Sequence, residues 1–193
     1  MLTYGYTHNI CYIIKYKENN MIKYLETKDL KNADNFRKLY LESFIENERV
    51  DFDKLFSGVF GDFKLVGQYD NDKFIGMMHY VVKEHFLHLN YFAIIPDCQN
   101  KGYGTKFLSW LKDTYPNTPI VVDVEEQDDT SDNADYRILR KMFSQKNGFK
   151  DGKYSYHWNG VYMTYFSTQD INADEFMKYI TWIFPTIKDI EKK

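Results

Sequence analysis

Cysteine is scarce in this chain, long apolar runs are absent, and neither sign of charge dominates. The 193 residues include two cysteines, Cys11 and Cys98, which lie far apart and have no metal-ligand partners at useful spacing. This usage predicts a protein of the reducing cytoplasm with no metal centre. No apolar run approaches bilayer length, and the N-terminus lacks the basic and apolar regions of a signal peptide. We therefore expect an intracellular protein with no membrane partner.

The charge balance argues against a nucleic-acid partner. Lys and Arg number 25 against 28 Asp and Glu, for a formal net charge of −3, and both signs are mixed along the chain. Nucleic-acid binding calls for a basic face. The composition gives no electrostatic argument for one.

The length predicts one domain, because 193 residues can bury a core and are too few for two ordinary domains to be the default. We expect that domain over residues 21–193. Residues 1–20 are an N-terminal extension with two interpretations. Either Met21 is the true start of the protein, or residues 10–16, which favour β structure, form an extra edge strand.

Hydrophobic spacing and turn chemistry predict alternating strands and helices. Apolar spacing predicts helices over 28–47 and 134–145, the second with Ile138, Leu139 and Met142 on one face. A capping pair, Asn172 and Glu175, starts a helix whose apolar stripe runs up to Pro185. Two further helices are predicted at 51–56 and from about Tyr103 to before Pro116, and two further strands at 89–95 and 120–124. Turn residues predict two hairpins. Asp70-Asn71-Asp72 joins strands 64–69 and 73–82, and Asn159-Gly160 joins strands 154–158 and 161–166.

Residues 88–111 contain, in succession, the elements that form an anion-binding site. An apolar strand and a Pro-Asp turn lead through Gly102 and Gly104 into an amphipathic helix. The glycines let the backbone approach a ligand, and the helix directs its unpaired N–H groups and positive dipole end into the same space. A pyrophosphate would fit there. The P-loop and dinucleotide patterns both fail, because Thr105 separates Gly104 from Lys106 and Phe107 stands where a third glycine is needed.

The segment Gln99-Asn100-Lys101-Gly102-Tyr103-Gly104 resembles the Q/R-x-x-G-x-G/A signature of the GNAT superfamily of N-acetyltransferases. Residues 140–149, RKMFSQKNGF, resemble the late R-x-x-F-Y-x-x-N-G-F signature of the same family. The similarity runs from about Met21, where the first strand of the family would begin, to Phe166. It implies an α/β fold of the α+β kind: a mixed, largely antiparallel central sheet with helices on both faces.

The resemblance also implies acetyl-CoA as the co-substrate. In the family, successive loop amides hold its pyrophosphate, and the pantetheine arm lies along the strand before the loop. The residues that the resemblance assigns to the pyrophosphate are Gln99, Asn100, Lys101, Gly102, Tyr103, Gly104 and Thr105. Phe92 and Ile94 are expected to contact the pantetheine through their backbone, and Asn147 to shape a helix-ending turn near the cofactor.

Acetylation of an amine needs a group that removes the amine proton. Many relatives have an acid at the position of Asn90, whose amide cannot accept a proton. One candidate is His88, two residues earlier on the same strand face, although a structural histidine is the commoner outcome. The other is Glu125, at the end of the next strand, acting directly or through water. We prefer Glu125 for substrate contact, because small relatives also carry acids after that strand.

Glu125 belongs to a run of acids with no base among them: Asp123, Glu125, Glu126, Asp128, Asp129, Asp132 and Asp135. The run is either a solvated loop or an anionic rim that attracts a cationic amine. The second interpretation predicts a small amine, a polyamine-like compound or an amino sugar as acceptor.

The sequence thus predicts a cytoplasmic N-acetyltransferase that transfers acetyl from acetyl-CoA directly to a small amine. Two residues, Asn90 and Ser144, depart from the pattern of the family and favour an alternative function. Relatives place a tyrosine at the position of Ser144 to protonate the leaving thiolate, and Asn90 and Ser144 together could indicate an acyl-CoA-binding protein or sensor with little catalysis. Longer acyl groups and a homodimer stay open.

Overall fold

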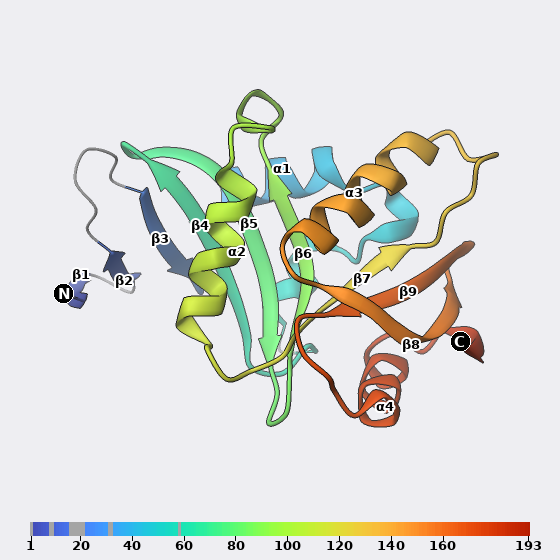
Figure 1. The fold of residues 1–193 in the computed structure, drawn as a ribbon. Helices are drawn as coiled ribbons and strands as arrows, with labels where there is room; N and C mark the ends of the chain where they lie inside the picture. Colours follow the sequence, from blue (N-terminus) through green and yellow to red (C-terminus); the bar gives the residue numbers. More distant parts are fainter. Residues whose placement is uncertain (1, 8–9, 16–21, 31–32, 58) are drawn as a thin grey trace. The chain divides into compact units, whose positions relative to one another are not determined.

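The protein combines a mixed, largely antiparallel sheet with helices on both faces, as expected (Figure 1). A computed structural model describes residues 2–7, 10–15, 22–30, 33–57 and 59–193. They group into two compact units: unit 1 comprises Met1–Val82 and Asn90–Thr114, and unit 2 comprises Lys83–Leu89 and Tyr115–Lys193. The expectation of one domain over residues 21–193 stays a prediction.

Unit 1 contains five strands that pair antiparallel in chain order, together with the second part of β6. The strands are β1 (Leu2–Thr7), β2 (Ile10–Lys15), β3 (Ile22–Thr27), β4 (Phe63–Asp70), β5 (Lys73–Val82) and β6 (Leu87–Ile94). The strand predicted over 10–16 appears as β2, but β1 lies beyond it, so β2 is not the edge strand that was expected; Tyr16 lies outside the described residues. Asn71 and Asp72 take left-handed φ values of 48° and 65°, which is the geometry of a two-residue hairpin turn.

Two helices cover opposite faces of unit 1, namely α1 (Asp34–Ser43) and α2 (Tyr103–Thr114). Gly67 of β4 faces α1, since a Cβ there would lie 2.8 Å from Phe36 Cζ. The next residue, Gln68, hydrogen-bonds α2, because successive strand residues point to opposite faces. Short 3-10 helices occupy Glu46–Glu48, Phe52–Phe56 and Pro96–Cys98.

The helix predicted over 28–47 is shorter than expected. Phe44 adopts extended backbone angles, with φ −122° and ψ 132°, and thereby ends α1. Its ring packs against Tyr40 at 5.4 Å and Tyr91 at 5.0 Å between centroids. Aromatic packing therefore stops a helix that propensity alone would continue.

Unit 2 contains β7 (Ile120–Glu125), β8 (Lys150–Trp158), β9 (Val161–Ser167) and β10 (Lys188–Lys192), next to the first part of β6. Leu87 to Leu89 of β6 pair in parallel with β7, and the order continues antiparallel through β9, β8 and β10. Asn159 and Gly160 form the predicted hairpin turn, with φ values of 46° and 93°. The exposed strand β10 was not expected from the sequence.

The helices α3 (Ala134–Lys146) and α4 (Ala173–Ile183) cover opposite faces of unit 2. Lys141 of α3 lies over the ring of Phe166, whereas Phe176 of α4 packs on the neighbouring Tyr165. The capping prediction is confirmed, because Asn172 Oδ1 accepts from the backbone N–H of Glu175. No helix within the described ranges is long and apolar enough to cross a membrane.

Candidate functional site

Residues 95–102, which we call the glycine loop, join the end of β6 to α2. The loop and the start of α2 leave a series of backbone N–H groups without backbone acceptors. Asn100 and Gly102 take left-handed φ values of 59° and 82°. Among the described residues, the N–H groups of positions 100–105 donate to no backbone carbonyl; the first that does is Lys106, to Gly102 O at 3.0 Å. These donors lie at the positive end of α2, which makes the loop suitable for an anion.

Three residues of β3 and β4 hold the start of α2 in place, and sequence analysis missed all of them. Gln68 Nε2 donates to Tyr103 O at 3.3 Å, and the Tyr24 hydroxyl donates to Lys106 O at 3.2 Å. The Tyr103 hydroxyl donates to Asp70 Oδ2 at 2.5 Å, and this hydrogen bond raises the pKa of Tyr103. The available signal was Gln68 itself, the one polar side chain among the four buried residues at the centre of β4.

Polar side chains of the loop fold back onto its own backbone. Gln99 Nε2 donates to Ile94 O at 3.0 Å, and Lys101 Nζ donates to Asp97 O at 2.6 Å. A Cβ at Gly102 would meet no atom within 4 Å, so the space beside this residue is open. The loop side chains therefore set its shape, while the backbone amides of residues 100–105 are available to a ligand.

The strand before the loop is fixed by a close approach of two backbones. A Cβ at Gly76 of β5 would lie 2.5 Å from Ala93 O, so only glycine fits there. The ring of Phe92 packs on Phe107 of α2, with 5.9 Å between centroids. Phe92 and Ile94 are half-buried, and their proposed contact with pantetheine is made by their backbone.

The carboxylate of Glu125 is buried and fully engaged. Its side chain is 3% exposed and pairs with Arg137 Nε at 3.3 Å and with Arg140. Asn133 Nδ2 also donates to Glu125 Oε1 at 2.9 Å. The acid run has no base within it, but α3 supplies two arginines from further along the chain. This neutralised carboxylate does not fit the expected role of attracting a cationic acceptor.

His88 lies in the core of unit 2. It has 0% exposure, its Nε2 lies 2.6 Å from Asp123 Oδ2, and Phe176 and Tyr179 pack edge-on against its ring. Asp123 also accepts a hydrogen bond from the hydroxyl of Tyr156, and burial together with this carboxylate raises the pKa of Tyr156. This environment favours a structural histidine, and it engages the partly exposed carboxylate of Asp123 with two side chains of the core.

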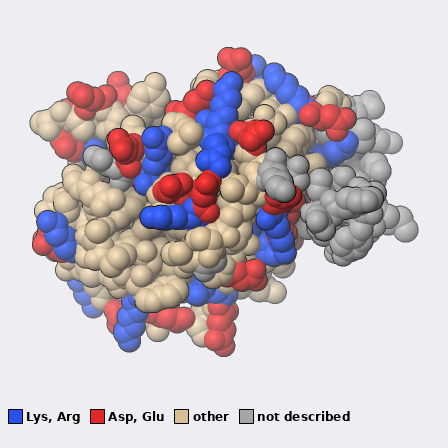
Figure 2. Space-filling model, turned by 180° about the vertical axis from the view of Figure 1, so that it is seen from behind, with Lys and Arg blue, Asp and Glu red and all other residues tan. Residues whose placement is uncertain are grey.

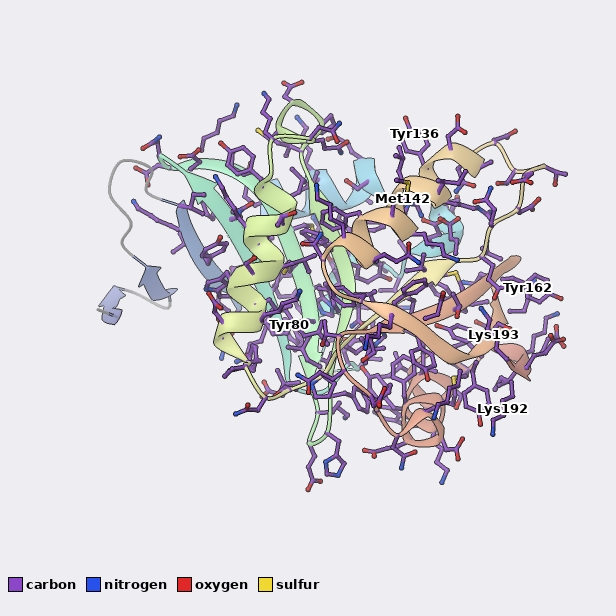
Figure 3. All side chains as sticks on the ribbon, in the orientation of Figure 1. Tyr80, Tyr136, Met142, Tyr162, Lys192 and Lys193 are labelled. Atoms are coloured by element: carbon purple, nitrogen blue, oxygen red, sulfur yellow. The ribbon has the colours of Figure 1, made fainter. Side chains whose placement is uncertain are left out.

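Other members of the acid run lie at the surface of unit 2. Glu126 pairs with Lys193 Nζ at 2.6 Å, and Asp128 accepts from the hydroxyl and N–H of Thr130, which lowers the pKa of Asp128. A cavity of about 280 Å³ opens beside them, near Tyr162 and Lys193 in Figure 3. Its lining consists of Glu126, Gln127, Asp128, Arg137, Gly160, Val161 and Tyr162.

The late motif forms the C-terminal turn of α3. Asn147 Nδ2 donates to Phe143 O at 2.9 Å, and Gly148 follows with a left-handed φ of 80°. Asn147 therefore shapes the turn as expected, and its place near the cofactor stays a prediction. Ser144 is buried in this turn. Asn90, the other departure, lies with its Nδ2 3.2 Å from His79 Nδ1.

The acyl-CoA-dependent acyltransferases have this arrangement. In them, an anion-binding loop connects a strand of a mixed sheet to the first turn of a helix. Residues 33–137 match the acetyltransferase (GNAT) family. The chain belongs to this family. The matched range includes the glycine loop and ends before the late motif.

Solved structures show the same fold. A protein assigned to the GNAT acetyltransferases of Bacteroides thetaiotaomicron is 24% identical, with a TM-score of 0.65 over 84% of this chain and 97% of that one. The aminoglycoside 6′-N-acetyltransferase of Enterococcus faecium is 13% identical, with a TM-score of 0.56 over 75% and 94%. A GNAT acetyltransferase of Elizabethkingia anophelis with acetyl-CoA bound is 13% identical, with a TM-score of 0.55 over 80% and 100%. The search of curated proteins gives no match.

Proposed function

We propose that the protein transfers acetyl from acetyl-CoA directly to the amine of a small acceptor in the cytoplasm. The supporting observation is the run of N–H groups at positions 100–105, which lack backbone acceptors among the described residues and lie at the positive end of α2. A pyrophosphate carries the charge that such donors stabilise. The similar protein from Elizabethkingia anophelis was solved with acetyl-CoA bound.

Residues of the chain hold and orient the cofactor in this proposal. The amides of residues 100–105 bind the pyrophosphate, and Gln68, Tyr24 and Asp70 keep those amides in place through α2. The backbone of Phe92 and Ile94 positions the pantetheine arm, so that the thioester meets the acceptor amine. When bound, acetyl-CoA supplies the activated acetyl group.

A small cationic amine is the acceptor class that we propose. Four members of the acid run are exposed at the surface of unit 2, where their charge favours a cation: Asp128, Asp129, Asp132 and Asp135. On the face drawn in Figure 2, acidic and basic side chains are interspersed, and no basic field suited to a polyanion stands out. The similar protein from Enterococcus faecium is an aminoglycoside acetyltransferase, and aminoglycosides are amino sugars.

A panel of amines tests this function. Polyamines, amino sugars and amino acids are each mixed with the protein and acetyl-CoA, thiol release is followed, and the product mass is measured. We expect at least one amine to gain an acetyl group. If acetyl-CoA binds but no amine is acetylated, the alternative of an acyl-CoA-binding protein is supported. The buried Ser144 and the His79-bonded Asn90 favour that second candidate.

His88→Gln is expected to change kcat by less than about threefold, because a fully buried side chain cannot meet a diffusing amine. Glutamine retains an N–H that can donate to Asp123. General-base catalysis contributes about a hundredfold or more, so the two roles differ clearly in rate. Steady-state kinetics with the best amine of the panel, together with a melting curve, gives the answer. A hundredfold fall in kcat at an unchanged melting temperature would restore His88 as the base.

A further inference from the structure

The helix α3 presents its apolar side to solvent. Ile138 is 44% exposed, and Leu139 and Met142 are each 58% exposed; Tyr136 is 65% exposed. Tyr136 and Met142 are labelled on α3 in Figure 3. Only Ser144 of the 13 helix residues is buried. A stripe of this kind normally faces a core, and exposed apolar patches mark interaction sites.

Ionic contacts fix this orientation. Arg137 and Arg140 point to Glu125 of β7, and Lys141 lies over Phe166 of β9. The charged side of α3 therefore covers the sheet of unit 2. Rotating the helix to bury the stripe would separate the two arginines from a buried carboxylate, which is costly.

Three pairs of positions on this face mirror one another about a point between residues 140 and 141, whereas the position that mirrors Tyr136 is the polar Gln145. Leu139 and Met142 are equidistant from that point, as are Ile138 and Phe143, and Asp135 and Lys146. These positions follow the spacing of one helix face. Asp135 and Lys146 are exposed, and neither forms an ion pair with another described residue.

We propose that α3 packs antiparallel against α3 of a second copy of this chain about a two-fold axis at that point. Leu139 then meets Met142 of the partner subunit, Ile138 meets Phe143 of the partner subunit, and each Asp135 meets Lys146 of the partner subunit. Opposite charges meet at both ends, roughly 16 Å apart at 1.5 Å per residue. A different partner would not require this self-complementary pattern. The contact is small, so the dimer is weak and concentration-dependent.

Sedimentation velocity over a concentration series, from about 1 to 200 µM, tests the dimer on the full chain. We expect the wild-type mass to rise toward that of two chains and Leu139→Lys to weaken association at least tenfold, which is about 1.4 kcal/mol. Trp182→Lys is the matched control, because Trp182 of α4 is 67% exposed and lies outside the stripe. It is expected to leave association unchanged.

A charge exchange tests the register. Asp135→Lys and Lys146→Asp each place like charges opposite one another and weaken the dimer, whereas the double variant restores opposite charges and recovers association. A monomer at every concentration overturns the proposal, as does a dimer that Leu139→Lys leaves intact. Failure of the double variant to recover association overturns the antiparallel register. None of these results depends on acetyl transfer, so this inference and the proposed function are tested separately.

Discussion

Gly104→Val is expected to weaken acetyl-CoA binding at least tenfold, about 1.4 kcal/mol, with little change in melting temperature. Gly104 lies in the first turn of α2 and is not among the glycines with left-handed φ. Other residues can adopt its backbone conformation, so in our account the glycine serves only the close approach of a phosphate. A valine side chain would occupy that space. Isothermal titration calorimetry on wild type and variant measures the difference.

A second glycine pair separates ligand loss from backbone strain. Gly102 and Gly61 have φ values of 82° and 80°, and a Cβ at either would meet nothing within 4 Å. Valine therefore strains both sites alike. We expect Gly102→Val and Gly61→Val to lose similar stability, and only Gly102→Val to lose cofactor affinity. Two results would contradict the assignment of the pyrophosphate to this loop: unchanged acetyl-CoA affinity in Gly104→Val, or a loss of acetyl-CoA affinity in Gly61→Val equal to that in Gly102→Val.

Glu125→Gln is expected to lower the free energy of unfolding by about 3 kcal/mol or more, because it leaves buried arginine charge without its partner. Arg137 is 10% exposed, so water compensates little there. The matched control is the neighbouring Glu126→Gln, whose Lys193 pair is at the surface, with 40% and 32% exposure. That change should cost less than about 1 kcal/mol. Urea unfolding of the three proteins gives both values.

The same pair of variants tests the hypothesis from sequence. If Glu125 contacts the acceptor, Glu125→Gln raises the acceptor KM and leaves stability near that of wild type. If it is a structural carboxylate, stability falls and acetyl-CoA affinity in the folded protein is retained. Equal stability of Glu125→Gln and Glu126→Gln would contradict the structural assignment.

Sequence predicted best those elements that local chemistry decides. The two hairpins follow from turn residues that tolerate left-handed φ, and α4 follows from its cap at Asn172. The errors have distant causes. Phe44 ends α1 to pack on Tyr91, which lies 47 positions later by residue number, and no local signal marks β10 as a strand.

The residues of the candidate site also divide into those that local sequence predicts and those whose environment depends on distant residues. The glycine loop is contiguous in sequence, so its residues could be named in advance. The environment of Glu125 depends on Arg137 and Arg140, which follow it by more than ten residues, and that of His88 depends on Asp123 from another strand. A charge pattern read along the chain cannot show these pairings, which engage the carboxylates of Asp123 and Glu125.

The crystal structure of the complex with CoA tests the central claim most directly. We predict that pyrophosphate oxygens lie within about 3.2 Å of backbone N–H groups of residues 100–105, at the start of α2. A pyrophosphate bound elsewhere on the chain, with those N–H groups facing only solvent, would contradict the account.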